Sequence, residues 1–405
     1  MVVSVEDVPA RDVARPGSAE ELAEVVRQAD DRGLAVAPIG GGTQLDLGNP
    51  PARLDLLVET TGLNRVVEYE PADLTITVEA GIRFTDLQAT LGQEGQMLAL
   101  DPLAAPEATI GGLVATNASG PLRFAHGTAR DLVIGSRVAN PDGALTRAGG
   151  RVVKNVAGYD LNKLHIGALG TLGVLVELSF KLAPIPPASA TVAGQFRELE
   201  SVRQLLNVVV HSPLSPLAVE LLGRGALEAA GLSRQTAVVL RVGGYPEAVQ
   251  RQVRDLNALV QKHGGEPVDA TDATWDALKR MQLAAQRKEV VLKVAVPIAE
   301  LTVVVDLLEQ QLKGFESAVW AHAGSGVAYA ACDTAPEADT VLQLRRQVVA
   351  LGSNASLVVQ RCPTVLKRSV DVWGDPGPSL GLMKALKAKL DPRGTLNPGR
   401  YVGGI

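Results

Sequence analysis

The 405-residue chain is predicted to be an α+β protein with two domains and a returning tail. Short strands and amphipathic helices follow one another along the chain, as in layered α+β folds. The stretch APIPPAS, residues 183–189, is a predicted linker, and helical and strand patterns alternate regularly after it. We therefore expect a first domain over residues 1–184, a second over 190–380, and a C-terminal helix and tail over 381–405.

The first domain begins with a predicted helix over residues 18–33, in which Ser18 and Glu21 fit a capping box and Gly33 marks the end. LAVAPIG then gives a short buried strand, followed by LLVE, RVVEYE and LTITVEAG. The alternation in TITVEAG predicts a half-buried strand. FTDLQATLGQEG is a second helix with Thr85 as its N-cap.

The rest of the chain continues in the same manner. LVIGSRVANPDGALT is a predicted hairpin that turns at residues 141–143, and GVLVELSFKLAP is a strand. After the linker, helices and strands alternate from ESVRQLLNVVVHS to residue 360. The last segment is a short basic helix that ends at Asp391-Pro392, followed by a loop.

Composition excludes several classes of function. With 39 Lys and Arg against 44 Asp and Glu, the net charge of −5 offers no overall attraction for nucleic acid or an anionic membrane. Cys332 and Cys362 form no CxxC, so reduced thiols in a cytoplasmic protein are the simplest interpretation. No signal peptide or membrane-spanning stretch is expected. Peripheral attachment at the inner face of a membrane through partners stays open.

Familiar catalytic motifs are absent from the sequence. GxGxxG, GxxxxGK[ST] and HExxH do not occur, which argues against Rossmann dinucleotide binding, P-loop hydrolysis and zincin chemistry. The five histidines lack ligand spacing, so no metal site is predicted.

Two glycine-rich loops remain as candidate binding elements. PIGGGTQ, taken alone, is either a long flexible turn or a nest of backbone N–H groups for a phosphate. A second loop, PEATIGGLVATNASG, mixes glycines with Thr and Asn, as a loop against a pyrophosphate and a ribityl chain requires. GALGTLGV adds Gly170 and Gly173 just before a strand.

These loops, in this order, resemble the FAD-binding domain of the vanillyl-alcohol oxidase and p-cresol methylhydroxylase (PCMH) family over residues 14–184. The resemblance implies a two-subdomain PCMH-type FAD-binding domain, an α+β cap over 190–380, and a tail, LDPRGTLNPGR, that returns to the FAD domain. No histidine lies in the first loop, so FAD is expected to be noncovalent. The implied cofactor-binding residues are Ile39, Gly40, Gly41, Gly42, Thr43, Gln44, Pro102, Thr109, Ile110, Gly111, Gly112, Thr116, Asn117, Gly120, Gly173, Val174 and Asn397.

GPLRFAHGTARDLVIG and RVVKNVAGYDLNKLHIGALGTLGV resemble, more closely, the smaller FAD-binding subunits of bacterial glycolate oxidases. Such a subunit implies two partners, a larger flavin subunit and an iron–sulfur subunit. The function implied is oxidation of glycolate, or electron transfer to these partners. A stand-alone D-2-hydroxy-acid dehydrogenase and a noncatalytic assembly subunit are the alternatives. The glycines argue against the last, since nothing structural is expected to demand them together.

Candidate catalytic residues follow from the same resemblance. Relatives that act on D-2-hydroxy acids carry a histidine pair and a Glu-His-Gly that hold a metal, whereas WAHAGSGVAYA here has one histidine, and VVQRCPTVLK stands where Glu-His-Gly is expected. His322 is the candidate base for the hydroxyl proton and Arg361 the candidate cation for the carboxylate. The alternative is a structural role for each.

Overall fold

The computed structural model describes residues 4–103, 106–150, 159–229 and 236–405. The chain divides into two compact units. Unit 1 comprises Met1–Ser119, Gly127–Ile185 and Asp375–Ile405, and unit 2 comprises Gly120–His126 and Pro186–Gly374. The C-terminal segment thus belongs to unit 1, and a short piece of the Gly-rich region belongs to unit 2.

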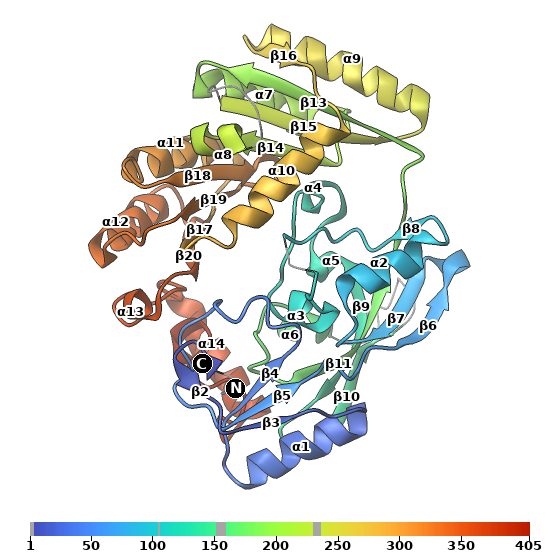
Figure 1. Cartoon of the computed structure of the whole chain (residues 1–405), viewed down its shortest axis with the longest axis vertical. Helices are drawn as coiled ribbons and strands as arrows, with labels where there is room; N and C mark the ends of the chain where they lie inside the picture. Colours follow the sequence, from blue (N-terminus) through green and yellow to red (C-terminus); the bar gives the residue numbers. More distant parts are fainter. Residues whose placement is uncertain (1–3, 104–105, 151–158, 230–235) are drawn as a thin grey trace. The chain divides into compact units, whose positions relative to one another are not determined.

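Unit 1 contains two main sheets, whose strands follow the labels of Figure 1. The antiparallel sheet has the order β10 (Leu145–Gly149), β9 (Val133–Ala139), β11 (Val174–Lys181), β7 (Thr75–Glu79) and β6 (Val66–Glu70). The parallel sheet has the order β3 (Asp12–Ala14), β5 (Leu56–Glu59) and β4 (Val36–Ile39). Two small pairs complete it, β1 (Ser4–Val5) with β2 (Val8–Pro9), and β8 (Gln96–Met97) with β12 (Ala183–Pro184).

The helices of unit 1 are short except for the first and last. They are α1 (Ala19–Asp31), α2 (Phe84–Gly92), α3 (Ile110–Ala115), α5 (Ala129–Leu132), α6 (Asn162–His165) and α14 (Leu380–Leu390), with 3-10 turns η1 (Pro71–Asp73), η4 (Gly377–Ser379) and η5 (Val402–Gly404).

Several local predictions for unit 1 can be compared with this structure. Ser18 caps α1, its Oγ accepting from the Glu21 amide at 3.1 Å, while the Glu21 carboxylate accepts from Gly17 rather than Ser18. The hairpin is confirmed, since β9 pairs with β10 in antiparallel register. Thr85 as an N-cap is wrong, because the N-cap is Arg83 and α2 begins at Phe84, so Thr85 lies inside the first turn. The half-buried strand is also wrong, because β7 is buried on both faces.

The C-terminal tail adds to the parallel sheet of unit 1. The Val36 amide donates to the Thr395 carbonyl at 2.7 Å, and the Asn397 amide donates to the Val36 carbonyl at 2.8 Å. The ammonium of Lys387, on α14, donates to the carbonyls of Thr171 and Leu396, each at 2.8 Å. These bonds fix the tail, drawn in red, beside the blue N-terminal strands in Figure 1.

Unit 2 is one antiparallel sheet of eight strands with helices on both faces. Its order is β16 (Glu266–Val268), β13 (Ala188–Phe196), β15 (Thr236–Gly244), β14 (Ala218–Leu222), β18 (Ser317–His322), β19 (Val327–Cys332), β17 (Val290–Ala295) and β20 (Ser356–Arg361). The helices are α4 (Arg123–His126), α7 (Leu199–His211), α8 (Arg224–Ala229), α9 (Pro246–Lys262), α10 (Asp272–Ala285), α11 (Leu301–Gln311), α12 (Ala338–Val349) and α13 (Thr364–Lys367), with η2 (Ile298–Glu300) and η3 (Ala323–Ser325).

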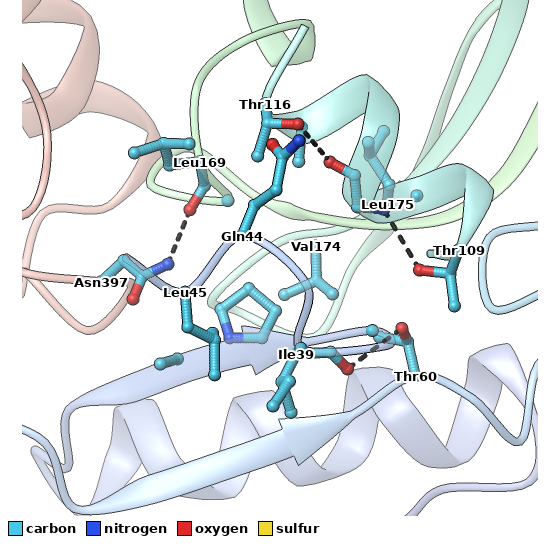
Figure 2. Close-up of a pocket in the computed structure, with 18 of the residues that line it drawn as sticks. Ile39, Gln44, Leu45, Thr60, Thr109, Thr116, Leu169, Val174, Leu175 and Asn397 are labelled. Carbon is cyan, nitrogen blue, oxygen red and sulfur yellow. Dashed lines mark hydrogen bonds between the residues drawn. The ribbon is translucent and has the colours of Figure 1, made fainter. Parts of the chain in front are cut away.

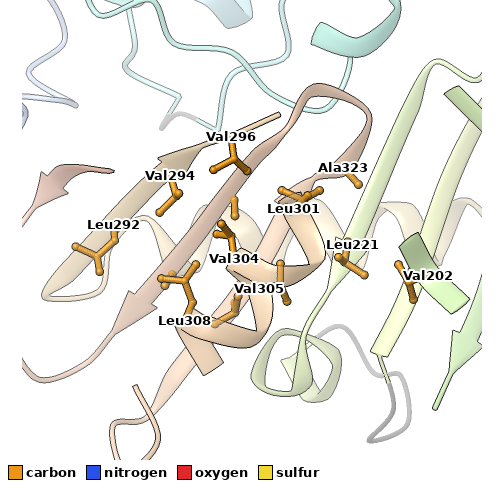
Figure 3. Close-up of a cluster of buried hydrophobic side chains, with 14 of the residues drawn as sticks. Val202, Leu221, Leu292, Val294, Val296, Leu301, Val304, Val305, Leu308 and Ala323 are labelled. Atoms are coloured by element: carbon orange, nitrogen blue, oxygen red, sulfur yellow. The ribbon is translucent and has the colours of Figure 1, made fainter. Parts of the chain in front are cut away.

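The core of unit 2 lies between one face of this sheet and α7, α9, α11 and α12. Figure 3 shows Leu292 and Val294 of β17 pointing into this core with Leu301 and Leu308 of α11. Each fully buried Val or Leu stabilises the fold by about 1.5–3 kcal/mol over an exposed one. Because side chains alternate along a strand, Lys293 faces the opposite side, where α8 and α10 pack.

Candidate cofactor site and polar cluster

The first glycine loop starts where β4 ends at Ile39, whose carbonyl accepts from the Thr60 amide at 2.8 Å. A Cβ on Gly40 would collide with the Thr109 hydroxyl, and one on Gly41 with the Glu107 carbonyl. Gly42 has a φ of +69°, which disfavours other residues. The first two glycines therefore let the second loop pack against the first.

The second loop leads into α3. Thr109 caps this helix, its Oγ1 accepting from the Gly112 amide at 3.4 Å, and Thr116 donates to the Gly112 carbonyl at 2.8 Å. Gly111 leaves no room for a Cβ, which would lie 2.8 Å from the Ala80 side chain. The expectation that nothing structural demands these glycines is therefore wrong, since loop packing already requires several of them.

The third element and the tail meet at Leu169. The Asn397 side-chain amide donates to the Leu169 carbonyl at 2.6 Å, a bond drawn in Figure 2. Asn397 is buried, with a φ of 44°. Its Oδ1 is left without a hydrogen-bond partner among the described residues. A buried acceptor without a donor costs about 1–3 kcal/mol, so a ligand donor at this position would be favourable.

These elements surround one pocket within unit 1, with Thr109 and Thr116 of the α3 region on one side and Asn397 on the other in Figure 2. Its empty volume is about 920 Å³, which includes space open to solvent. Predicted residues that line it are Ile39, Gly40, Gly41, Gly42, Thr43, Gln44, Thr109, Gly111, Gly112, Thr116, Gly173, Val174 and Asn397.

Four predicted cofactor residues are not among those that line the pocket: Pro102, Ile110, Asn117 and Gly120. Ile110 points into the core of unit 1, and Gly120 belongs to unit 2. Residues 151–158 of the second resembling stretch lie outside the described residues. The other lining residues were not among the predicted cofactor residues, although Gly170 belongs to the third glycine element; they are Val5, Ala37, Pro38, Leu45, Thr60, Leu113, Ala115, His165, Leu169, Gly170, Leu175 and Arg400.

The charge of the pocket is low and positive. Among its described lining residues no carboxylate occurs, and the ionisable side chains are His165 and Arg400. Burial lowers the pKa of His165 to about 4, so the imidazole is neutral near pH 7. Burial also lowers the pKa of Arg400, to about 10, and its guanidinium stays protonated. A glycine-lined pocket with one cation and a buried acceptor on Asn397 fits FAD, which carries an anionic diphosphate and ring donors.

The two candidate catalytic residues lie far apart in unit 2. His322 ends β18, opposite Val327 and hence level with Ala295 of β17, whereas Arg361 of β20 pairs with Val291. The two residues are separated by three strand spacings and four residues, roughly 20 Å between Cα atoms. Their joint action on one small hydroxy acid does not fit this register.

His322 belongs instead to a buried polar cluster. Its Nδ1 lies 2.9 Å from Glu220 Oε1, and the Gln282 amide donates to the same carboxylate at 2.6 Å. Because a carboxylate only accepts, Nδ1 carries a proton. Nε2 is buried with no hydrogen-bond partner in the described part of the chain. Tyr329 packs its ring edge-on against His322, with centroids 5.2 Å apart.

Lys293 is a cation on the same side of the sheet. It stands opposite Tyr329 in the register of β17 and β19. Burial, together with the nearby charge of Arg123, lowers the pKa of Lys293 to about 8. Burial raises the pKa of Tyr329 to about 12. We call Glu220, Gln282, His322, Tyr329 and Lys293 the polar cluster; sequence reasoning identified only His322 of its members.

Two family matches cover most of the chain. A FAD binding domain matches residues 10–149, and the C-terminal domain of FAD linked oxidases matches residues 185–354 and 376–401. Among the described residues, no helix is long and apolar enough to cross a membrane.

Curated relatives align over much of the chain. Glycolate oxidase subunit GlcD of Bacillus subtilis is 26% identical over 96% of this chain and 88% of its own. A mitochondrial D-lactate dehydrogenase [cytochrome] of Saccharomyces cerevisiae is 27% identical over 95% of this chain and 71% of its own. Glycolate oxidase subunit GlcE of Escherichia coli is 37% identical over 49% of this chain and 56% of its own.

A solved structure of p-cresol methylhydroxylase shares the fold, with a TM-score of 0.74 over 96% of this chain and 88% of its own at 16% identity. The predicted PCMH-like α+β fold is thereby confirmed. With the matched domains on both sides of the linker, the chain belongs to the FAD-linked oxidoreductases, and FAD is its cofactor.

Proposed function

We propose that the chain is the FAD-binding subunit of a glycolate oxidase complex and that it oxidises glycolate or a similar small 2-hydroxy acid. Relatives named as glycolate oxidase subunits and D-lactate dehydrogenases support this substrate class. The observation that carries the proposal is the polar cluster, in which a buried histidine bound to a carboxylate and a half-buried lysine occupy one face of the sheet.

Oxidation of a 2-hydroxy acid removes the hydroxyl proton and the hydrogen on C2 with its electron pair. FAD, when bound, supplies the acceptor for that hydrogen. Glu220 orients His322 and stabilises the imidazolium, so that Nε2 can take the hydroxyl proton. The ammonium of Lys293 binds the substrate carboxylate, and this pairing replaces the role proposed for Arg361.

A different observation supports electron transfer as a second role. Glycolate oxidase subunit GlcE of Escherichia coli is 37% identical to this chain over about half of its length. Partners that receive electrons, a larger flavin subunit and an iron–sulfur subunit, are therefore part of the proposal. We also propose that FAD is bound noncovalently. The domain limits at residues 184 and 190 stay predictions.

The test compares the purified chain alone with the chain co-expressed with the genes that neighbour its own. Each preparation is assayed for dye reduction with glycolate, D-lactate and D-2-hydroxyglutarate. Activity of the chain alone with glycolate supports oxidation at its own flavin, whereas activity only with D-lactate supports the stand-alone dehydrogenase. Activity that appears only in a co-purifying complex supports the electron-transfer role. A chain that binds FAD yet has no activity in either preparation contradicts the proposal.

A further inference from the structure

Arg400 lies in the cofactor pocket and comes from the far end of the chain. Its side chain is 4% exposed, and it lines the same pocket as Gly42, Gln44 and Leu45 of the first glycine loop. Its Nη2 donates to the carbonyls of Leu45 and Leu47, at 2.9 Å for Leu45. One edge of the guanidinium is thus bound to the segment that follows the three glycines.

The backbone around Arg400 is fixed independently of any ligand. Its carbonyl accepts from the Asn49 amide at 3.0 Å, and the Pro398 carbonyl accepts from the Ala52 amide at 2.8 Å. Gly399 has a φ of 87°, and a Cβ there would lie 3.0 Å from Ala52. The tail and the loop therefore hold the guanidinium in position before a cofactor enters, which reduces the ordering cost of binding.

The charge of Arg400 has a favourable partner in the cofactor. Glu6 and Asp46 are near enough to favour its protonated form, but neither carboxylate is among the described residues that line the pocket. His165, the other ionisable lining residue, is neutral near pH 7. Each of the two phosphates of FAD carries a negative charge, and an arginine fork matches phosphate oxygens in both charge and geometry.

We propose that Arg400 recognises the diphosphate of FAD and that the C-terminal tail is thereby part of the cofactor site. The two glycine loops supply shape and backbone donors, and Arg400 supplies the positive charge. This inference rests on FAD binding and is independent of which hydroxy acid the chain oxidises. Its failure would leave the proposed reaction untouched.

The test measures the affinity of the apoprotein for FAD, ADP and riboflavin, which lacks the diphosphate, by fluorescence and calorimetry. Loss of one charged hydrogen bond predicts that Arg400→Gln weakens FAD and ADP about 10- to 100-fold and riboflavin hardly at all. Arg400→Lys should keep most of the affinity. Arg393→Gln is the matched control, since Arg393 is also on the tail but pairs with Asp30 outside the pocket lining.

The salt dependence of FAD affinity gives a second readout, which can be measured first on the wild-type chain. The affinity of the wild-type chain for FAD should fall with added salt, and this slope should flatten in Arg400→Gln. Equal weakening of FAD and riboflavin in Arg400→Gln would assign Arg400 to the Leu45 and Leu47 carbonyls alone and overturn the proposal. Unchanged FAD affinity in this variant, or a salt-independent affinity of the wild type, would also overturn it.

Discussion

In unit 1 the cofactor pocket is formed by glycines, hydroxyls and apolar residues from a few short, separate segments, whereas in unit 2 the polar cluster takes single side chains from four strands and one helix. The pocket carries one buried cation near a glycine loop, while the cluster combines a buried carboxylate and a buried imidazole with a half-buried ammonium. Close fit thus contributes most to the cofactor pocket, and positioned charged groups contribute most to the polar cluster. Substitutions should separate these two contributions.

Lys293→Met should give the largest effect. Without the ammonium, kcat/KM for a 2-hydroxy acid should fall about 100-fold or more, as expected when one partner of a buried charge pair is removed. FAD affinity should not change, because Lys293 does not line the cofactor pocket. Steady-state dye reduction and FAD titration measure the two quantities. Lys279→Met, at an exposed position of α10, is the matched control.

The same variant should be more stable than the wild type. The folded-state pKa of Lys293 is about 8, below the usual 10.5, so the unfolded chain binds more protons between these values. The wild-type free energy of unfolding should therefore rise with pH from about 8 to 10.5. At pH 7, Lys293→Met should gain roughly 1–3 kcal/mol. Urea unfolding at several pH values measures this, and a destabilised variant would count against a desolvated ammonium.

Gly41→Ala should disrupt unit 1 by sterics alone. The new Cβ would overlap the Glu107 carbonyl, so the two loops must separate, at a cost of about 1–3 kcal/mol. FAD affinity should fall with it. Gly92→Ala is the control, because nothing lies near its Cβ position, and helix propensity favours alanine there by up to about 1 kcal/mol. If Gly41→Ala and Gly92→Ala have the same stability and FAD affinity, Gly41 is not required for packing of the two loops.

His165 should make unit 1 sensitive to acid. Burial holds its folded-state pKa at about 4, below the usual 6.5, so the unfolded chain binds more protons between these values. The apoprotein should lose roughly 2–3 kcal/mol as the pH falls from about 6.5 to 4. Thermal unfolding of wild type and His165→Asn across this range checks the claim. A parallel loss in both proteins would assign the acid sensitivity to other groups.

Glu220→Gln should have the smallest effect on stability. The carboxylate accepts from both His322 and Gln282, and an amide in its place offers one acceptor oxygen and adds a donor. We expect a loss of about 1–2 kcal/mol and a slower oxidation, because no carboxylate would then orient His322 or stabilise the imidazolium formed in the reaction. Glu309→Gln on α11 serves as a comparison for a carboxylate outside the cluster. Unaltered kinetics in Glu220→Gln would exclude His322 as the base.

The cofactor loops could be predicted from the sequence because each loop is recognisable within one short stretch of residues. Three glycines after a strand, and a glycine pair that follows a threonine cap, already predict loops whose backbone lies close to another group. What the sequence could not show is that Gly40 and Gly41 approach another loop. Arg400 was missed because its partners, Leu45 and Leu47, lie some 350 residues earlier in the chain.

The polar cluster could not be predicted for a related reason. Strand pairing decides which residues lie side by side. It places His322 opposite Glu220 and Lys293 opposite Tyr329, whereas Arg361 lies on the edge strand β20. A lone lysine inside the apolar run VVLKVAV was the one available signal, because a buried lysine on a strand is rare without a function.

The most direct measurement mixes the FAD-loaded chain with glycolate under anaerobic conditions and follows the flavin absorbance. We expect the absorbance of oxidised flavin to be lost, at a rate that saturates with glycolate and is strongly reduced in Lys293→Met. If the flavin stays oxidised with glycolate, D-lactate and D-2-hydroxyglutarate, yet dithionite reduces it, this chain does not oxidise hydroxy acids at its own cofactor.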